Sequence, residues 1–209
     1  MTDYTPARRA EMLERRLHEH GHVDPEKIDA DIAAAESAEG NYPSPALGAR
    51  VVARAWADGG FRQRLAANPI AALGEYVPQG TPIAVLENTP TVHHVIVCTL
   101  CSCYPSGLLG NPPAWYKSFE YRSRVVREPR AVLAEFNLEL DADMTIRVHD
   151  STAEQRYLVL PMRPAGTHGW DQERLAALVT RNSMIGTGRA LSPTSGSQPS
   201  PVSTPVSGE

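Results

Sequence analysis

Three cysteines lie within one short segment of the chain, "VCTLCSC", and no other segment contains any: Cys98, Cys101 and Cys103. The residues before them, Thr91 to Cys98, are rich in β-branched side chains, which predicts a strand that ends at the first cysteine. The spacing Cys-x-x-Cys-x-Cys can gather three sulfurs around one point in a tight loop, whereas a helix would spread them over its surface. The fold must therefore present a sulfur-rich loop at a strand end, and this spacing indicates one bound metal ion.

Composition limits the class of protein that carries this loop. The chain has 209 residues, enough for one well-filled core with an appended arm, and its net charge of −4 does not favour nucleic-acid binding. No apolar run approaches the roughly 20 residues of a membrane span, and the N-terminus lacks the apolar segment of a signal peptide. We therefore expect a cytoplasmic protein without membrane or nucleic-acid partners. There, clustered cysteines indicate metal binding or catalysis rather than disulfides.

The chain divides into three zones. Residues 1–78 are expected to form a helical N-terminal arm, in which Ile28 to Ala35 is one helix and "EGNYPSPALG" forms a hinge. Residues 79–190 combine strand and helix patterns and are expected to form a metal-binding α/β catalytic domain. Residues 191–209 are rich in Ser and Pro with few large apolar side chains, which predicts a disordered tail.

Within the second zone, four segments rich in β-branched residues predict strands: 82–87, 91–98, 144–150 and 156–162. Between the second and third of these, "YKSFEYRSRVVREPRAVLAEFNLEL" predicts two helices, the second with Pro129 in its first turn. A last helix is expected from Gln172 to Thr180. This alternation of strands and helices indicates the α/β class.

A non-catalytic structural zinc site is one interpretation of the three cysteines alone. Such a site ordinarily takes four tetrahedral ligands, so it would need a fourth ligand such as His93 or His94. These histidines are neighbours on a predicted strand and point to opposite faces, so at most one could face the cysteines. Spacing alone leaves zinc open.

The residues between the cysteines are more specific. "VCTLCSC" resembles, without a mismatch, the metal-binding signature of the nitrile hydratase α subunit and of its relative, the thiocyanate hydrolase γ subunit. The segments "VLENTPTVHHVIVCTLCSCYP", "PPAWYKS", "YRSRVVREPRAVLAEF" and "RYLVLPMRPAGT" resemble the same family, from about Asp24 to Gly186. The resemblance implies a layered α-β-β-α domain with a helical arm. Thr99 resembles the cobalt-type members, since iron-type members have Ser there.

The resemblance also implies a ligand set. Cys98, Cys101 and Cys103 would supply three sulfurs, and the ionised backbone amides of Ser102 and Cys103 two nitrogens, to a low-spin, non-corrin Co(III) ion. In the family, Cys101 is oxidised to a sulfinate and Cys103 to a sulfenate, while Cys98 stays a thiolate. These are successive steps in the oxidation of a metal-bound thiolate. Cys101 and Cys103 would thus be the catalytic residues.

The activity that the resemblance implies is hydration of a nitrile to its amide, a hydro-lyase reaction. The trivalent ion would act as a Lewis acid on the nitrile or on a bound water, and the Cys103 sulfenate oxygen would act as nucleophile or base. The family resemblance also implies a β-type partner subunit that completes the pocket, and we expect a metal-insertion chaperone. Thiocyanate hydrolysis by a γ-type subunit remains an alternative activity.

Other polar residues are weaker candidates. "HDSTAEQRY" resembles a family segment that orients the metal loop, which makes Asp150, Glu154 and Arg156 candidates; an ordinary ion-pair network is the alternative. Trp115 could line the pocket or pack beside the core. Three histidines in "LHEHGH" and four arginines in "RSRVVREPR" are expected to be solvated, although the arginines could face an acidic partner.

Two departures from the family pattern concern substrate size and one loop. Ser106 and Gly107 stand where relatives commonly have a Trp-Pro pair, and both are expected in the pocket wall. Their small size predicts a wide pocket for a bulky, heteroaromatic nitrile such as the deazapurine nucleoside toyocamycin, unless the partner subunit fills the space. His168 stands where Asp is usual, which makes a role for that loop doubtful.

Overall fold

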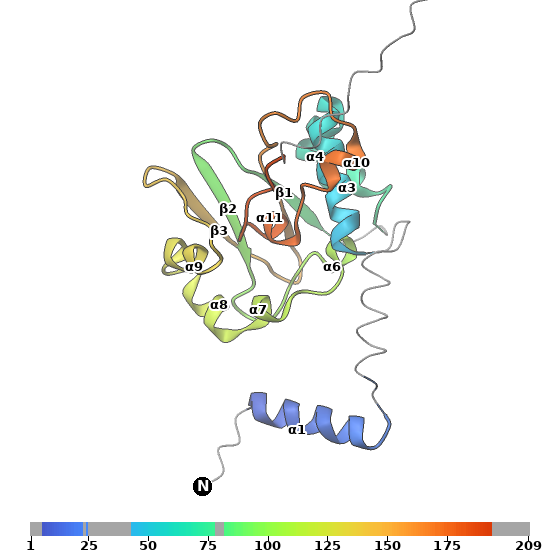
Figure 1. Ribbon diagram of the computed structural model, residues 1–209, viewed down its shortest axis with the longest axis vertical. Coiled ribbons are helices and arrows are strands. Elements are labelled where there is room, and N and C mark those ends of the chain that lie inside the picture. Colours follow the sequence, from blue (N-terminus) through green and yellow to red (C-terminus); the bar gives the residue numbers. More distant parts are fainter. Residues whose placement is uncertain (1–5, 23, 25–42, 78–81, 194–209) are drawn as a thin grey trace, which may run out of the picture.

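The computed structural model describes residues 6–22, 24, 43–77 and 82–193. Four short strands lie in the middle of the main body, and helices cover them on both sides (Figure 1). The helices α3 (Pro45–Ala57), α4 (Gly59–Ala67) and α10 (Gln172–Ala176) lie on one side, and α8 (Phe119–Arg124) and α9 (Pro129–Glu135) lie on the other. This arrangement is the expected layered α/β fold. The first helix, α1 (Pro6–Glu19), lies apart from the body.

The strands form two parallel pairs. β1 (Ile83–Glu87) pairs with β4 (Arg156–Leu160), and β2 (Val92–Val97) pairs with β3 (Thr145–Asp150). All four strands lie where the sequence predicts them, to within two residues at each end. In the β2–β3 pair the register joins Val97 to Asp150, so both strands end beside the cysteine loop.

Local sequence explains where the helices of the first side begin. Pro45 occupies the first turn of α3, and the Ser44 hydroxyl caps that helix by accepting from the Leu47 N–H. The extended backbone of Asp58 ends α3, and its carboxylate caps α4 by accepting from the Phe61 N–H. A further short helix, α5 (Pro69–Leu73), is capped by Asn68.

The helices between β2 and β3 are shorter and more numerous than the two expected. They are α6 (Ser106–Leu109), α7 (Ala114–Lys117), α8 and α9. Pro112 and Pro113 separate α6 from α7, and the capping hydroxyl of Ser118 starts α8 directly after α7. The expected first turn of α9 at Pro129 is confirmed.

The last expected helix, Gln172 to Thr180, is shorter than predicted, because α10 ends at Ala176. A separate helix, α11 (Arg181–Ile185), begins after the Thr180 cap, beyond the predicted range. Gly186 ends α11 with φ = 91°, and its backbone packs directly against β2, because a Cβ there would lie 2.0 Å from the His94 carbonyl oxygen. Only glycine permits both features.

The hydrophobic core lies between the strands and both helical sides, and its members come from nearly every element of the body: Leu47, Val51, Phe61, Leu65, Val95, Ile96, Leu109, Tyr116, Leu133, Leu158, Met184 and Ile185. The end of the expected hinge is helical instead, because Pro45 to Gly48 lie in α3 and Gly48 packs against Leu109 and Met184; residues 39–42 of that segment lie outside the described residues. The helix α3, which belongs to the expected arm, packs on the body. The expected boundary between arm and catalytic domain at residue 78 stays a prediction. The helix expected at Ile28 to Ala35 and the residues of the tail after Pro193 lie outside the described residues.

Candidate metal centre

The cysteine loop begins directly after the last residue of β2. Cys98 is fully buried, Cys103 is partly buried and Cys101 is exposed, and all three are free thiols. The Cys101 sulfur lies 3.4 Å from the sulfurs of both Cys98 and Cys103. The loop therefore gathers its three sulfurs around one point, as the spacing predicts.

The sulfur spacing fits a shared metal ion. Two sulfurs that each lie about 2.3 Å from one ion are about 3.3 Å apart at right angles and about 3.8 Å apart at tetrahedral angles. The observed 3.4 Å is closer to the right-angle value. The three thiols form a group able to hold a metal ion, and their donor atoms all lie within 4.8 Å of one another. Three sulfurs at this spacing can share one metal ion.

The loop affects the pKa values of Cys101 and Cys103 in opposite directions. Hydrogen bonds with the Cys103 and Cys98 thiols, followed by those from the backbone N–H groups of Ser102 and Cys103, lower the pKa of Cys101 to about 7. Burial, followed by the hydrogen bonds with the other two thiols, raises the pKa of Cys103 to about 11. The N–H groups of Ser102 and Cys103 therefore act on the Cys101 sulfur.

Asp150 anchors one side of the loop. This last residue of β3 accepts hydrogen bonds from the Thr99 backbone N–H, at 2.9 Å, and from the Thr99 hydroxyl. Parallel pairing of β3 with β2 brings the carboxylate to the start of the loop. Asp150 thus contacts the loop directly, and its role in orienting the loop stays a prediction.

Arg122 holds the opposite side of the loop. From α8, its Nη1 donates to the carbonyl oxygens of Cys101, at 3.2 Å, and of Thr99, at 3.4 Å. We did not single out Arg122 from the sequence, because its run of arginines is typical of a solvated helix face. A contact with loop carbonyls depends on packing between helix and loop, which residue type does not reveal.

Tyr116 supports the loop from within the core. Its hydroxyl donates to the Cys103 carbonyl oxygen at 2.8 Å, and its ring is fully buried. Burial raises the pKa of Tyr116, so it remains a proton donor at neutral pH. The neighbouring Trp115 packs edge-on against Tyr121 and Phe136. This contact gives Trp115 a packing role beside the core.

The two histidines on β2 do not complete a metal site with the described cysteines. His93 is buried, with Nε2 2.7 Å from the Gly186 carbonyl oxygen and Nδ1 3.2 Å from the Asn88 amide nitrogen. His94 turns the other way and bonds His149 at 2.8 Å. Neither belongs to a group of donors with the cysteine sulfurs. Within the described residues, a fourth zinc ligand from this histidine pair is therefore missing.

The remaining candidates lie outside the loop contacts. Arg156 donates to the carbonyls of Thr152 and Ala153, and the Glu154 N–H donates to the Thr152 hydroxyl, so both order their own turn. Ser106 and Gly107 open α6, three residues beyond Cys103. The three histidines at the end of α1 are exposed and form no group with other metal-binding side chains of the described residues.

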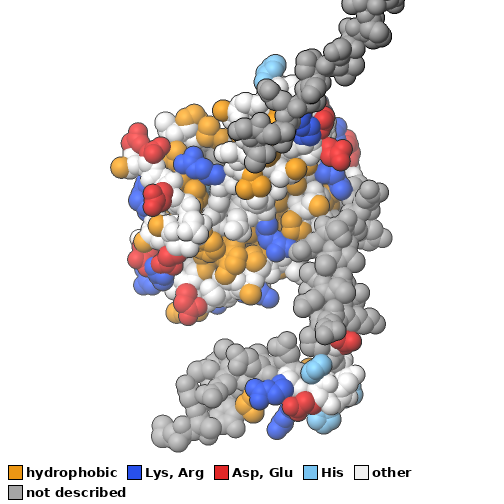
Figure 2. Space-filling view, in the orientation of Figure 1, with side chains coloured by type: hydrophobic (Ala, Val, Ile, Leu, Met, Phe, Trp, Pro, Cys, Tyr) orange, Lys and Arg blue, Asp and Glu red, His pale blue; other side chains and the backbone are white. Residues whose placement is uncertain are grey.

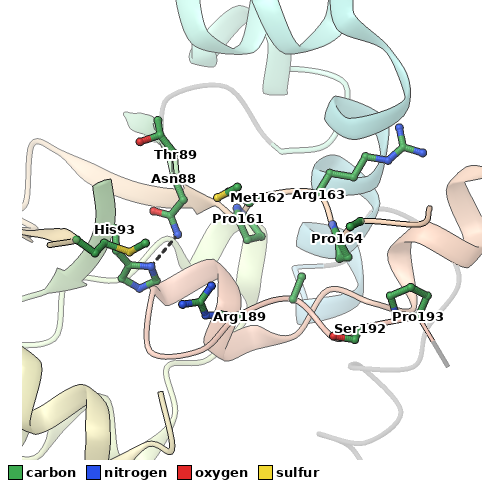
Figure 3. A pocket seen from close by; sticks show the side chains of 13 residues that line it. Asn88, Thr89, His93, Pro161, Met162, Arg163, Pro164, Arg189, Ser192 and Pro193 are labelled. Atoms are coloured by element: carbon green, nitrogen blue, oxygen red, sulfur yellow. Dashed lines mark hydrogen bonds between the residues drawn. The ribbon is translucent and has the colours of Figure 1, made fainter. Parts of the chain in front are cut away.

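A separate cavity of about 480 Å³ lies at the other end of β2 (Figure 3). His93 and Asn88 form one wall, and Pro161, Met162 and Pro164 face them. None of its lining residues comes from the cysteine loop. By contrast, Leu100 in the loop is 89% exposed. The described residues thus leave the loop open to solvent.

Comparison with known proteins identifies this architecture. The family model described as nitrile hydratase, alpha chain, matches residues 4–188. The α subunit of the low-molecular weight cobalt-containing nitrile hydratase from Rhodococcus rhodochrous is 50% identical over 183 residues, which cover 86% of each chain. The thiocyanate hydrolase γ subunit from Thiobacillus thioparus is 45% identical over 158 residues, covering 69% of this chain and 64% of that subunit.

A solved structure agrees with the sequence comparison. A double mutant of the Fe-type nitrile hydratase from Comamonas testosteroni superimposes with a TM-score of 0.70 at 38% identity. The match covers 92% of this chain and 94% of that one. The fold and the sequence therefore point to the same family.

Proposed function

Because this chain belongs to the nitrile hydratase α chain family, we propose that it is the metal-bearing α subunit of a cobalt nitrile hydratase. The enzyme would add water across the carbon–nitrogen triple bond of a nitrile and release the amide, which makes it a hydro-lyase. The observation that carries this proposal is the convergence of three cysteine sulfurs on one point within a cobalt-type motif.

The loop residues fit a cobalt ion. Cys98, Cys101 and Cys103 would supply sulfur ligands, and the amide nitrogens of Ser102 and Cys103, whose N–H groups act on the Cys101 sulfur, would complete five positions. Bound there, low-spin Co(III) would supply Lewis-acid chemistry to the nitrile or to water. We propose that Cys101 carries a sulfinate and Cys103 a sulfenate.

The chain's own residues would prepare this reaction by fixing the loop. Asp150 holds Thr99 through two hydrogen bonds, and Tyr116 holds the Cys103 carbonyl. These contacts keep the Cys103 side chain beside the metal position, where its sulfenate oxygen would act as nucleophile or base. Such preorganisation avoids reorganising the loop at the moment of reaction.

A β-type subunit would complete the pocket. Leu100, Phe119 and Val126 are large apolar side chains exposed on the loop and around α8, and on α1 Leu13 is 59% exposed. Figure 2 shows hydrophobic side chains gathered on the lower part of the body, around the position of α7. Apolar surface of this kind is typical of subunit interfaces. The open loop would gain its missing wall from that partner.

The setting of the subunit follows from its chemistry. No helix in the described residues is long and apolar enough to cross a membrane. We propose a cytoplasmic enzyme, because its thiols must stay reduced until the metal is bound. We also propose a chaperone that delivers cobalt to the exposed loop.

Ser106 and Gly107 would widen the pocket for a bulky, heteroaromatic nitrile.

A direct activity assay distinguishes the nitrile hydratase proposal from its relative. The purified enzyme, expressed with its partner subunit and cobalt, is given nitriles or thiocyanate in parallel. Amide formation without thiocyanate consumption is the expected result. Preferred turnover of thiocyanate would show that the chain is a γ-type thiocyanate hydrolase subunit instead.

A further inference from the structure

The Arg122 guanidinium contacts the peptide group that joins Cys101 to Ser102 in the loop. Its Nη1 donates to the carbonyl oxygen of Cys101 and also to that of Thr99. Arg122 thereby holds the carbonyl side of this peptide group from α8. Because the peptide group is planar and its N–H points opposite to its carbonyl, a hydrogen bond to the Cys101 carbonyl also fixes the direction of the Ser102 N–H.

Arg122 is not neutralised by a carboxylate within the described part of the chain. Arg124, two residues further along α8, forms ion pairs with both Glu128 and Glu135. Arg122 instead contacts only the carbonyl oxygens of the loop, and its buried Nε has no hydrogen-bond partner in the described residues. A buried charged donor without a partner is costly unless a further acceptor or negative charge is supplied.

The proposed metal centre supplies that charge. Three anionic sulfur ligands and two amide anions carry five negative charges against the three positive charges of Co(III), which leaves a net charge of about −2 on the centre. Asp150 adds a further carboxylate on the opposite side of Thr99. A cation placed beside this loop would therefore stabilise the loaded centre more than the metal-free one.

We propose that Arg122 is a positioning residue of the cobalt centre, which orients the Cys101–Ser102 peptide and compensates the negative charge of the loaded loop. This inference rests on the proposed function, since it requires the metal centre. Its role lies in metal retention rather than in stability of the fold. The metal-free chain would lose only two long hydrogen bonds from a half-buried side chain when Arg122 is replaced.

The test compares three variants in the enzyme assembled with its partner subunit. Arg122→Gln removes the charge but keeps a donor, and Arg122→Lys keeps the charge without the planar fork. Arg127→Gln is the matched control, because Arg127 lies nearby and bonds only the Ser123 carbonyl. The readouts are cobalt per chain, the sulfur-to-cobalt absorption band, the rate of cobalt release to a chelator, and the melting temperature of the metal-free chain.

We expect Arg122→Gln to release cobalt about 10- to 100-fold faster than the wild type, the range seen when residues that support metal ligands are lost. Arg122→Lys should recover much of this retention, and Arg127→Gln should match the wild type. The metal-free melting temperature should be alike in all four proteins.

Three results would overturn the inference: wild-type cobalt release by Arg122→Gln, equal losses in the Gln and Lys variants, or a matching drop in metal-free stability. Failure of the proposed function would appear differently, as absence of cobalt from the wild-type enzyme itself.

Discussion

At the residue scale, three cysteine sulfurs converge on one point, and Asp150, Arg122 and Tyr116 bond the loop that carries them. The cysteine spacing predicts the convergence, and the family-like segment around Asp150 indicates that residue. No sequence pattern indicates the contacts of Arg122 and Tyr116, because an arginine or tyrosine that binds a backbone carbonyl has no characteristic spacing.

Replacing Cys103 with Ser tests the sulfur chemistry. Serine removes the oxidisable sulfur and leaves a weaker oxygen donor, so we expect turnover to fall by about 1,000-fold or more, as when a group essential to the reaction is lost. The effect on folding should be small, because Cys103 is only partly buried. Thr99→Ser is the control, since its hydroxyl can still bond Asp150. Near-native rates in Cys103→Ser with cobalt bound would exclude a sulfenate mechanism.

Replacing Ser106 with Trp tests the size of the pocket. The large aromatic ring should narrow the pocket wall, so kcat/KM for a nucleoside nitrile should fall by about 10-fold or more relative to acetonitrile. Benzonitrile should lie between them. An unchanged ranking of the three nitriles, or a strong wild-type preference for acetonitrile, would show that Ser106 does not set substrate size.

At the scale of elements, strand positions are predictable and their partners are not. The β-branched runs predict all four strands, but the parallel pairings β1–β4 and β2–β3 depend on how the chain crosses over between them. The helical pattern of Gln172 to Thr180 likewise does not show that α10 ends at Ala176. These features depend on packing between elements that are distant in the sequence.

The contact between α11 and β2 should be sensitive to a single methyl group. Gly186→Ala would place a Cβ 2.0 Å from the His94 carbonyl oxygen in a left-handed backbone conformation, so we expect a loss of about 3 kcal/mol or more in unfolding free energy. Gly169→Ala is the matched control, because its φ is also positive, at 77°, but no heavy atom lies within 4 Å of its Cβ. It should lose only about 1 kcal/mol. Denaturant unfolding measures both, and equal losses would contradict the close packing.

The histidine pair between β2 and β3 should make stability depend on pH. Burial, and then the nearby His149, lower the pKa of His94 to about 4, whereas an unfolded histidine titrates near pH 6.5. The unfolded chain therefore binds more protons between these values, so the unfolding free energy should fall as pH decreases from about 6.5 toward 4. Partial exposure limits the change to the order of 1 kcal/mol.

His94→Gln should flatten this dependence between about pH 6.5 and 5, above the range in which most carboxylates titrate. His168→Gln replaces an exposed histidine and should leave the curve unchanged. Equal curves for the wild type and His94→Gln would show that the pair does not carry the effect.

At the scale of the whole molecule, the cysteine loop lies on the packed body, and the described residues leave its outer side exposed. The loop is fixed from behind by Asp150, Arg122 and Tyr116, which come from three different elements. Its outer residues Leu100 and Cys101 are exposed. Under the proposed function, the supported side of the loop would hold the metal and a partner subunit would complete the pocket on the open side.

Above all, we propose that this loop carries a cobalt centre with oxidised cysteines. Elemental analysis of the purified enzyme, combined with mass spectrometry of the peptide from Cys98 to Cys103, checks both parts at once. We expect one cobalt per chain, two added oxygen atoms on Cys101 and one on Cys103. Stoichiometric zinc with three unmodified cysteines would contradict it.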